Sequence, residues 1–178
     1  MILSEADFMT AVNDLLIKIT GIEQSRLFCG NQSREVLPAD GEFIIYTPIT
    51  RGRIGTNITS YSAVEDDIYG DYADKVLVTV DLQVDCYGDT ADNTAQKIEI
   101  FGRSELCNAW LKNNGYAIRV LTTTAPNDLT IVDDTRQYLK RFMLTMKICF
   151  TSELKNDVPW FDDVQITAIK NVDVFFKP

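Results

Sequence analysis

The feature that most constrains this sequence is a long stretch of alternating apolar and polar residues at 75–87 (KVLVTVDLQVDCY). One set of alternate positions is apolar throughout: Val76, Val78, Val80, Leu82, Val84 and Cys86. Because successive side chains of a strand point to opposite faces, the pattern predicts a β-strand with one face against a core. At roughly 3.4 Å per residue the stretch would span about 44 Å, more than one small core covers. We therefore expect part of it to project or to pair with another element.

An amphipathic helix is predicted directly after this strand. The turn Tyr87-Gly88-Asp89 leads into it, Asp89 is the expected N-cap, and Asn113-Asn114-Gly115 ends it. Its apolar stripe consists of Ala91, Ala95, Ile98, Gly102, Leu106 and Ala109. A glycine in a helix interior costs about 1 kcal/mol relative to alanine, so Gly102 indicates a close approach to a sheet.

The remaining pattern predicts one α+β domain over residues 1–178. A first helix begins at the N-cap Ser4 and ends at Gly21, and further strands are expected at 42–50, 116–123, 138–152 and 164–176. Residues 51–74 show no periodicity. The expected architecture is a mostly antiparallel sheet with two helices on one face and 51–74 as a projecting loop or β-hairpin.

Composition excludes several classes of function. The chain contains no histidine, which removes His-dependent triads and His-ligated zinc sites. A net charge of −9 disfavours duplex-DNA binding. The four cysteines form no CxxC motif and indicate buried, reduced thiols. No segment has the roughly 18 apolar residues of a membrane span. We expect no catalytic residues, cofactor or metal site, and a protein that is neither secreted nor bound to a membrane.

Two acidic side chains on the 75–87 strand were the first candidates for chemistry. Asp81 and Asp85 share one face of the strand at about 13 to 14 Å, whereas a glycosidase pair needs about 5 to 9.5 Å. Arg141 and Lys147 lie on the polar face of the 138–152 strand. Cross-strand ion pairs are therefore the simpler interpretation of these four residues.

Acidic residues in loops support one alternative, a small metal-dependent enzyme. Its candidate ligands would be Asp66, Asp67, Asp133 and Asp134. They lack the Asp-x-Asp-x-Asp-Gly spacing of a calcium loop, so solvated turn residues are the default interpretation of them. A generic α+β protein-binding adaptor is a further alternative.

Residues 76–111, read as one unit, resemble a signature of tailed-bacteriophage neck and tail-terminator proteins, above all of the phage neck terminator family. In that signature a strand ending in Val-Asp-x-Tyr-Gly leads into a helix that ends in Arg-Ser. The matching positions here are Val84, Asp85, Tyr87, Gly88, Asp92, Ala95, Ile98, Arg103 and Ser104. The close match covers about a fifth of the chain, and element order and length are compatible over the remainder.

The resemblance implies a structural virion protein rather than an enzyme. Such proteins form a ring, typically of six copies, that caps the tail tube and joins it to the head connector. The implied partners are other copies of this chain, the tail tube protein and a head–tail connector or stopper protein. The protein would be made in the cytoplasm of the bacterial host and reside in the virion neck. DNA would pass through an acidic lumen without specific binding.

Residues 51–74 are the expected docking element of such a ring. We expect them to contact a neighbouring subunit or a partner, because tyrosine and arginine are enriched at interface hot spots. We also expect them to be mobile in the isolated subunit, since a disordered segment can become ordered on binding. The alternative is a surface loop that packs on its own domain. The expected interface residues are Arg51, Arg53, Ile54, Tyr61, Tyr69, Tyr72, Asp81, Asp85, Arg141 and Lys147.

Overall fold

A computed structural model describes residues 5–30, 38, 41–62, 69–132 and 138–159 of the chain. Its main element is a mixed, mostly antiparallel sheet of six strands in the order β1-β2-β3-β8-β4, with β5 also pairing with β8. Three of these strands are long: β2 (Phe43–Ser62), β3 (Tyr69–Tyr87) and β8 (Arg141–Pro159). The middle one, β3, pairs antiparallel with both of its neighbours.

The other strands are short. β1 (Leu27–Cys29) follows a 3₁₀ turn, η1 (Gln24–Arg26), and pairs parallel with β2. The opposite side of the sheet carries β4 (Ile118–Thr123) and β5 (Asn127–Asp128). A separate two-stranded sheet joins β6 (Ile131–Val132) to β7 (Tyr138–Leu139).

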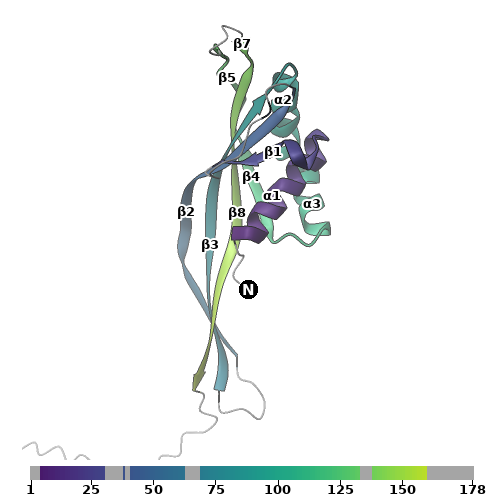
Figure 1. Ribbon diagram of the computed structural model, residues 1–178. Helices are drawn as coiled ribbons and strands as arrows, with labels where there is room; N and C mark the ends of the chain where they lie inside the picture. The colour runs from purple at the N-terminus through teal and green to yellow at the C-terminus, as the bar shows by residue number, and fades with distance from the viewer. Residues whose placement is uncertain (1–4, 31–37, 39–40, 63–68, 133–137, 160–178) are drawn as a thin grey trace, which may run out of the picture.

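Three helices cover one face of the sheet over part of its length (Figure 1). They are α1 (Glu5–Thr20), α2 (Ala91–Gly102) and α3 (Glu105–Asn113). The core lies between them and the sheet, and its largest side chains with less than 2% exposure include Leu15, Leu16, Leu82, Ile98, Leu111, Leu144, Met146 and Ile148. The predicted α+β class and the apolar face of the 75–87 strand are thereby confirmed.

The region predicted as one helix is in fact two. The Ser104 hydroxyl accepts a hydrogen bond from the Cys107 amide and starts α3 as its N-cap. This break changes the buried face, so Leu106 is 70% exposed while Cys107 and Leu111 are buried. The prediction of two helices with Leu106 and Ala109 in the buried stripe was therefore wrong. Thr90, not Asp89, occupies the N-cap position of α2.

Two glycines do have the roles that the sequence predicts. A Cβ on Gly102 would lie 2.4 Å from the Thr123 hydroxyl of β4, so the close helix–sheet approach is confirmed. Gly88 has a φ of +109°, and a Cβ there would lie 2.9 Å from the Gly41 carbonyl. Only glycine fits this turn without strain. Gly21, with a φ of +74°, follows the end of α1 as expected.

Residues 51–74 are not an irregular loop where the structure describes them. Residues 51–62 continue β2 and 69–74 begin β3, so the segment forms the two sides of a long β-hairpin. The expected strand at 42–50 is thus too short. Both faces of the hairpin are solvent-exposed over much of this length, so no apolar alternation marks its strands. Ser4, the 164–176 strand and the acidic residues Asp66, Asp67, Asp133 and Asp134 lie outside the described residues.

Candidate functional site

The three long strands continue past the helices as an extension that we call the arm. It consists of residues 54–62 of β2, 69–77 of β3 and 151–159 of β8, and it begins just beyond Phe150. The Phe150 ring packs on Phe8 of α1 at 5.7 Å between centroids, and the Arg51 guanidinium lies 5.3 Å from the centre of the same ring. Each strand adds about 30 Å beyond this point at roughly 3.3 Å per residue. Among the described residues, no helix covers the arm (Figure 1).

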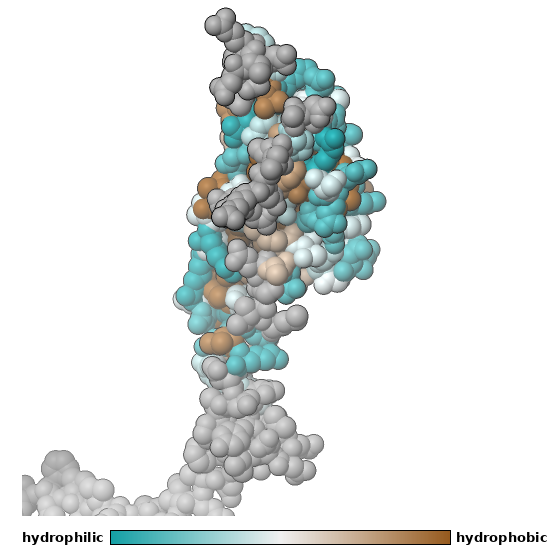
Figure 2. Space-filling model, viewed as in Figure 1, coloured by the Kyte–Doolittle hydropathy of each residue, from teal (hydrophilic) through white to brown (hydrophobic). Residues whose placement is uncertain are grey.

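Large apolar side chains on the arm are exposed. Their relative exposures are 47% for Ile54, 71% for Ile58, 44% for Tyr61, 38% for Leu77 and 52% for Leu154. Figure 2 shows hydrophobic residues recurring along this narrow part of the molecule among hydrophilic ones. They project from both faces of the arm, because Ile54 pairs with Leu77 whereas Tyr61 and Leu154 lie opposite the alternate positions of β3. Val76 at the base of the arm still packs against the core, whereas these five side chains lie on arm faces that are exposed.

Polar contacts between strands stiffen the arm. The Asp74 carboxylate accepts hydrogen bonds from the Thr59 hydroxyl at 2.7 Å and from the Tyr72 hydroxyl at 3.1 Å. Lys75 forms an ion pair with Glu153 at 3.2 Å. Because these contacts join all three strands, the arm is one sheet rather than three independent segments.

The structure brings six of the predicted interface residues to the arm or its base. Arg51 and Arg53 lie at the base, and Ile54, Tyr61, Tyr69 and Tyr72 lie in the arm. The sequence prediction missed Ile58, Leu77 and Leu154. Leu77 falls in the polar register of β3, and Leu154 falls beyond the predicted end of the 138–152 strand, so neither stood out as exposed apolar surface.

The other four predicted residues form cross-strand ion pairs within the chain, as expected. Lys147 lies 3.5 Å from an Asp81 carboxylate oxygen, and Arg141 contacts Asp85 through two nitrogens at 2.9 and 3.0 Å. Asp85 is only 4% exposed although it points away from the helices. Its second oxygen accepts a 2.6 Å hydrogen bond from Gln83.

A stacked pair of aromatic rings lies beside Arg141. Arg141 lies 5.7 Å from the centre of the Tyr87 ring, which stacks on Phe43 at 4.6 Å. Burial is the main cause that raises the pKa of the Tyr87 hydroxyl; Arg141 opposes this shift and Asp85 adds to it. Both carboxylate oxygens of Asp85 are occupied by partners in the same chain, which is the arrangement of a structural pair rather than of a catalytic acid.

No catalytic or metal-binding arrangement occurs in the part of the chain that the structure describes. No group of three or more cysteine or acidic side chains there could hold a metal ion. Burial raises the pKa of the Cys86 thiol to about 12 and that of Cys107 to about 11, so neither supplies a thiolate near neutral pH. Within the same residues, no helix is long and apolar enough to cross a membrane.

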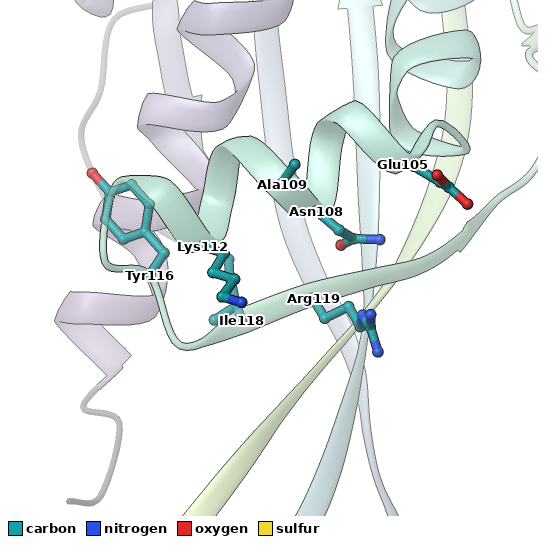
Figure 3. A pocket seen from close by; sticks show the side chains of 7 residues that line it. All are labelled: Glu105, Asn108, Ala109, Lys112, Tyr116, Ile118 and Arg119. Atoms are coloured by element: carbon teal, nitrogen blue, oxygen red, sulfur yellow. The ribbon is translucent and has the colours of Figure 1, made fainter.

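A surface hollow of about 560 Å³ lies between α3 and β4 (Figure 3). Glu105, Lys112 and Arg119 line it with charges of both signs. Asn108 also lines it, but its side chain is already engaged. Its amide donates to the Val120 carbonyl at 3.1 Å and accepts from the Val120 amide at 2.9 Å. The Asn108 side chain and the Val120 backbone thus satisfy each other's hydrogen bonds. The described residues that line the hollow therefore provide no set of free polar groups directed at one point, as a ligand site would need.

The residues of the 84–104 signature have structural roles that this geometry explains. Gly88 makes the turn, and the side chains of Ala95 and Ile98 are fully buried against the sheet. Arg103 donates a hydrogen bond to the Thr123 carbonyl at 2.9 Å, and Ser104 caps α3. The signature therefore specifies how the helices are docked on β3 and β4.

A packed α+β body with a projecting three-stranded arm of exposed apolar side chains is an architecture suited to contacts between proteins. The chain belongs to the phage neck terminator protein family, whose profile matches residues 6–172. No curated protein matches the sequence. The family is structural and non-enzymatic, and it places the chain in the neck of a phage virion, where it assembles with tail and neck proteins. Family membership thus removes the metal-dependent enzyme as an alternative.

Proposed function

We propose that this protein forms a closed ring of six copies that caps the tail tube and joins it to the head connector. Its partners would be its own copies, the tail tube protein and a connector or stopper protein. The match to the phage neck terminator family over residues 6–172 supports the neck and terminator roles. The observation that carries assembly into an oligomer is the arm, since exposed apolar surface of this kind is typical of protein–protein contacts.

In this ring the arm contacts the neighbouring subunit or the tail tube. Ile54, Tyr61 and the other exposed apolar side chains of the arm supply contact area, and Arg51 and Arg53 at its base supply polar contacts. The pairs Asp81–Lys147 and Asp85–Arg141 link β3 to β8 and hold the strands that carry the arm in a fixed register. These four charges would contribute to the interface mainly through that rigidity.

The ring is proposed to pass DNA without binding it. A net charge of −9 per chain would repel the phosphate backbone, which is the dominant source of affinity in nonspecific DNA binding. Genome passage requires only that the lumen does not retain the DNA.

Mass photometry and negative-stain microscopy test this proposal on the full chain, alone and with tail tube protein. A ring in either condition is the expected result, and monomers in both conditions over all concentrations would contradict it. The variant Ile54→Ser/Tyr61→Ser should weaken assembly. Tyr138→Ser is a matched control, since Tyr138 is 79% exposed but lies in β7, at the end of the sheet opposite the arm (Figure 1). It should assemble normally.

A further inference from the structure

In the body of this protein, parts of both edges of the sheet are covered. On one side, the Asn108 side chain pairs with both the N–H and the C=O of Val120, and Arg103 donates to the Thr123 carbonyl. These contacts block the outer edge of β4. On the other side, β1 pairs with the start of β2 at Ile44, Ile45 and Tyr46. Edge strands that stay open are templates for pairing with other chains, and these contacts close part of each edge in the body.

The arm has two edges that lack this protection within the described residues. Beyond Tyr46, no strand among them pairs with the outer side of β2, and beyond Phe150 none pairs with the outer side of β8. The open edge of β8 runs for about nine residues in the arm. That of β2 is irregular between Ile54 and Ile58, where Gly55 has a φ of +77°, and is regular over residues 58–62.

The open β2 edge also has the composition of a strand that pairs. Residues 54–62 (IGTNITSYS) contain no charged residue, and five of the nine are isoleucine, threonine or tyrosine. Natural edge strands that stay unpaired usually carry lysine, other charges or proline. Ile58, the most exposed large apolar side chain of the arm at 71%, lies in this segment.

We propose that the β2 edge of the arm pairs with the β8 edge of the arm in a second copy of this chain, so that the sheet continues from subunit to subunit. This inference rests on the proposed ring and identifies its interface. β2 and β8 run parallel within one subunit, because each is antiparallel to β3. Rotation about an axis along the arm preserves strand direction, so the strands that meet between copies are parallel as well.

Ring closure explains why the partner edge is β8 and not a second β2. Pairing of β2 with β2 would be isologous, would stop at a dimer and would leave both β8 edges open. Pairing of β2 with β8 is heterologous, and a rotation that closes uses every open edge in the ring. Exposed apolar side chains on both faces of the arm then gain neighbours across each junction.

A charge placed on the open edge tests the pairing. Ile58→Lys should raise the concentration at which the ring half-assembles by at least about tenfold, because a lysine on an edge strand opposes pairing. Leu121→Lys is the matched control, since Leu121 is 47% exposed on β4, whose edge Asn108 and Arg103 block. It should assemble as the unmodified chain does, and both variants should keep the unmodified melting temperature.

Cysteine cross-linking tests the direction of the pairing. Ser60 of β2 and Lys155 of β8 both lie opposite Ala73, hence at the same height and on the same face of the arm. Neighbouring strands are about 4.8 Å apart, which is within disulfide range. Ser60→Cys combined in turn with Thr151→Cys, Glu153→Cys or Lys155→Cys covers the possible stagger between copies. Mild oxidation of one combination should give a ladder beyond the dimer, which neither single variant nor the unmodified chain should give.

The outcomes separate this inference from the proposed function. A ring that forms without any cross-linked ladder, and that forms equally well with Ile58→Lys, overturns the edge pairing while leaving the ring intact. Dimers from Ser60→Cys alone would show β2–β2 pairing and also overturn it. If truncation after Pro159 exposes the 54–62 amides to hydrogen exchange in the monomer, the chain's own C-terminal segment covers the edge, and the inference is wrong. Monomers under all conditions would reject the ring itself.

Discussion

At the scale of single residues, the Asp85 carboxylate shows how this chain uses its acidic groups. It is nearly inaccessible to water, and Arg141 and Gln83 occupy its oxygens. Asp81, four positions earlier, has a single ion-pair contact, and the side chains of Asp81 and Lys147 are 31% and 46% exposed. Breaking the two ion pairs should therefore destabilise the fold by different amounts. A buried charge that loses its partner lowers the free energy of unfolding strongly, whereas a more exposed charge lowers it little.

Asp85→Ala should lower the free energy of unfolding by about 2 to 4 kcal/mol, because it leaves the partly buried Arg141 and Gln83 without their acceptor. Asp81→Ala should cost less than about 1 kcal/mol. Urea denaturation of both variants measures the difference. Adding Arg141→Met to Asp85→Ala should recover part of the loss, since it removes the unpaired charge. Equal losses for the two single variants would contradict this account.

The buried thiols predict a specific alkaline sensitivity. The folded-state pKa is about 12 for Cys86 and about 11 for Cys107, against 9.0 for an ordinary thiol. Because the folded values are raised, the unfolded chain ionises first as pH increases. Stability is therefore fully retained below pH 9 and falls above it, by about 1.4 kcal/mol per pH unit for each thiol until the folded thiol also ionises.

Guanidinium unfolding at pH 8, 9.5 and 10.5 measures this slope. The double variant Cys86→Ala/Cys107→Ala serves as the control, because tyrosines and lysines titrate in both proteins and cancel in the comparison. The unmodified chain should lose stability more steeply than the double variant above pH 9. Parallel curves would show that these thiols do not control the alkaline response.

At the scale of elements, the sequence predicts those parts whose pattern one core determines. The apolar face of β3, the N-terminal helix and the contact at Gly102 follow from periodicity or from glycine placement. The break between α2 and α3 does not follow from the sequence pattern. A serine such as Ser104 can occupy either a helix interior or an N-cap, so the residue type alone does not show that a new helix begins there. Tertiary contact decides this case, since Arg103 next to it reaches across to the Thr123 carbonyl.

The contact between Asn108 of α3 and Val120 of β4 can be tested by substitution. Asn108→Ala should destabilise the protein by about 1 to 3 kcal/mol, because it leaves the amide and carbonyl of Val120 without their partner. It should also open the β4 edge, so that aggregation at high concentration increases. Asn114→Ala is the control, since Asn114 is exposed and its side chain donates to the Trp110 carbonyl of the same helix rather than to a strand. Thermal unfolding and light scattering measure the two effects, and identical behaviour of the two variants would refute the blocking role.

At the scale of the whole molecule, the described residues divide into a body stabilised by its core and an arm held by strand pairing and by cross-strand polar contacts. This division explains why the strands within residues 51–74 could not be predicted from the sequence. Strands with no buried face carry no apolar period, so residues 54–62 look like a loop in the sequence although β3 pairs with Ile54 and with residues 58–62. The excess length of β3 was the one signal that a sheet extended beyond the core. Residue type alone had singled out six residues that lie in the arm or at its base, whereas the part of β8 beyond residue 152 was not predicted as a strand.

Shortening the arm should separate folding from assembly. Replacing residues 59–74 with a two-residue Asn-Gly turn joins Ile58 to Lys75, which already face each other across the hairpin. The core stays intact, because its largest buried side chains, such as Leu82 and Ile148, lie beyond the deletion. We expect the melting temperature to fall by less than about 4 °C, the equivalent of about 1 to 2 kcal/mol, while mass photometry with tail tube protein shows no ring. A shortened chain that still forms rings would place the interface on the body, and one that unfolds outright would show that the arm stabilises the fold itself.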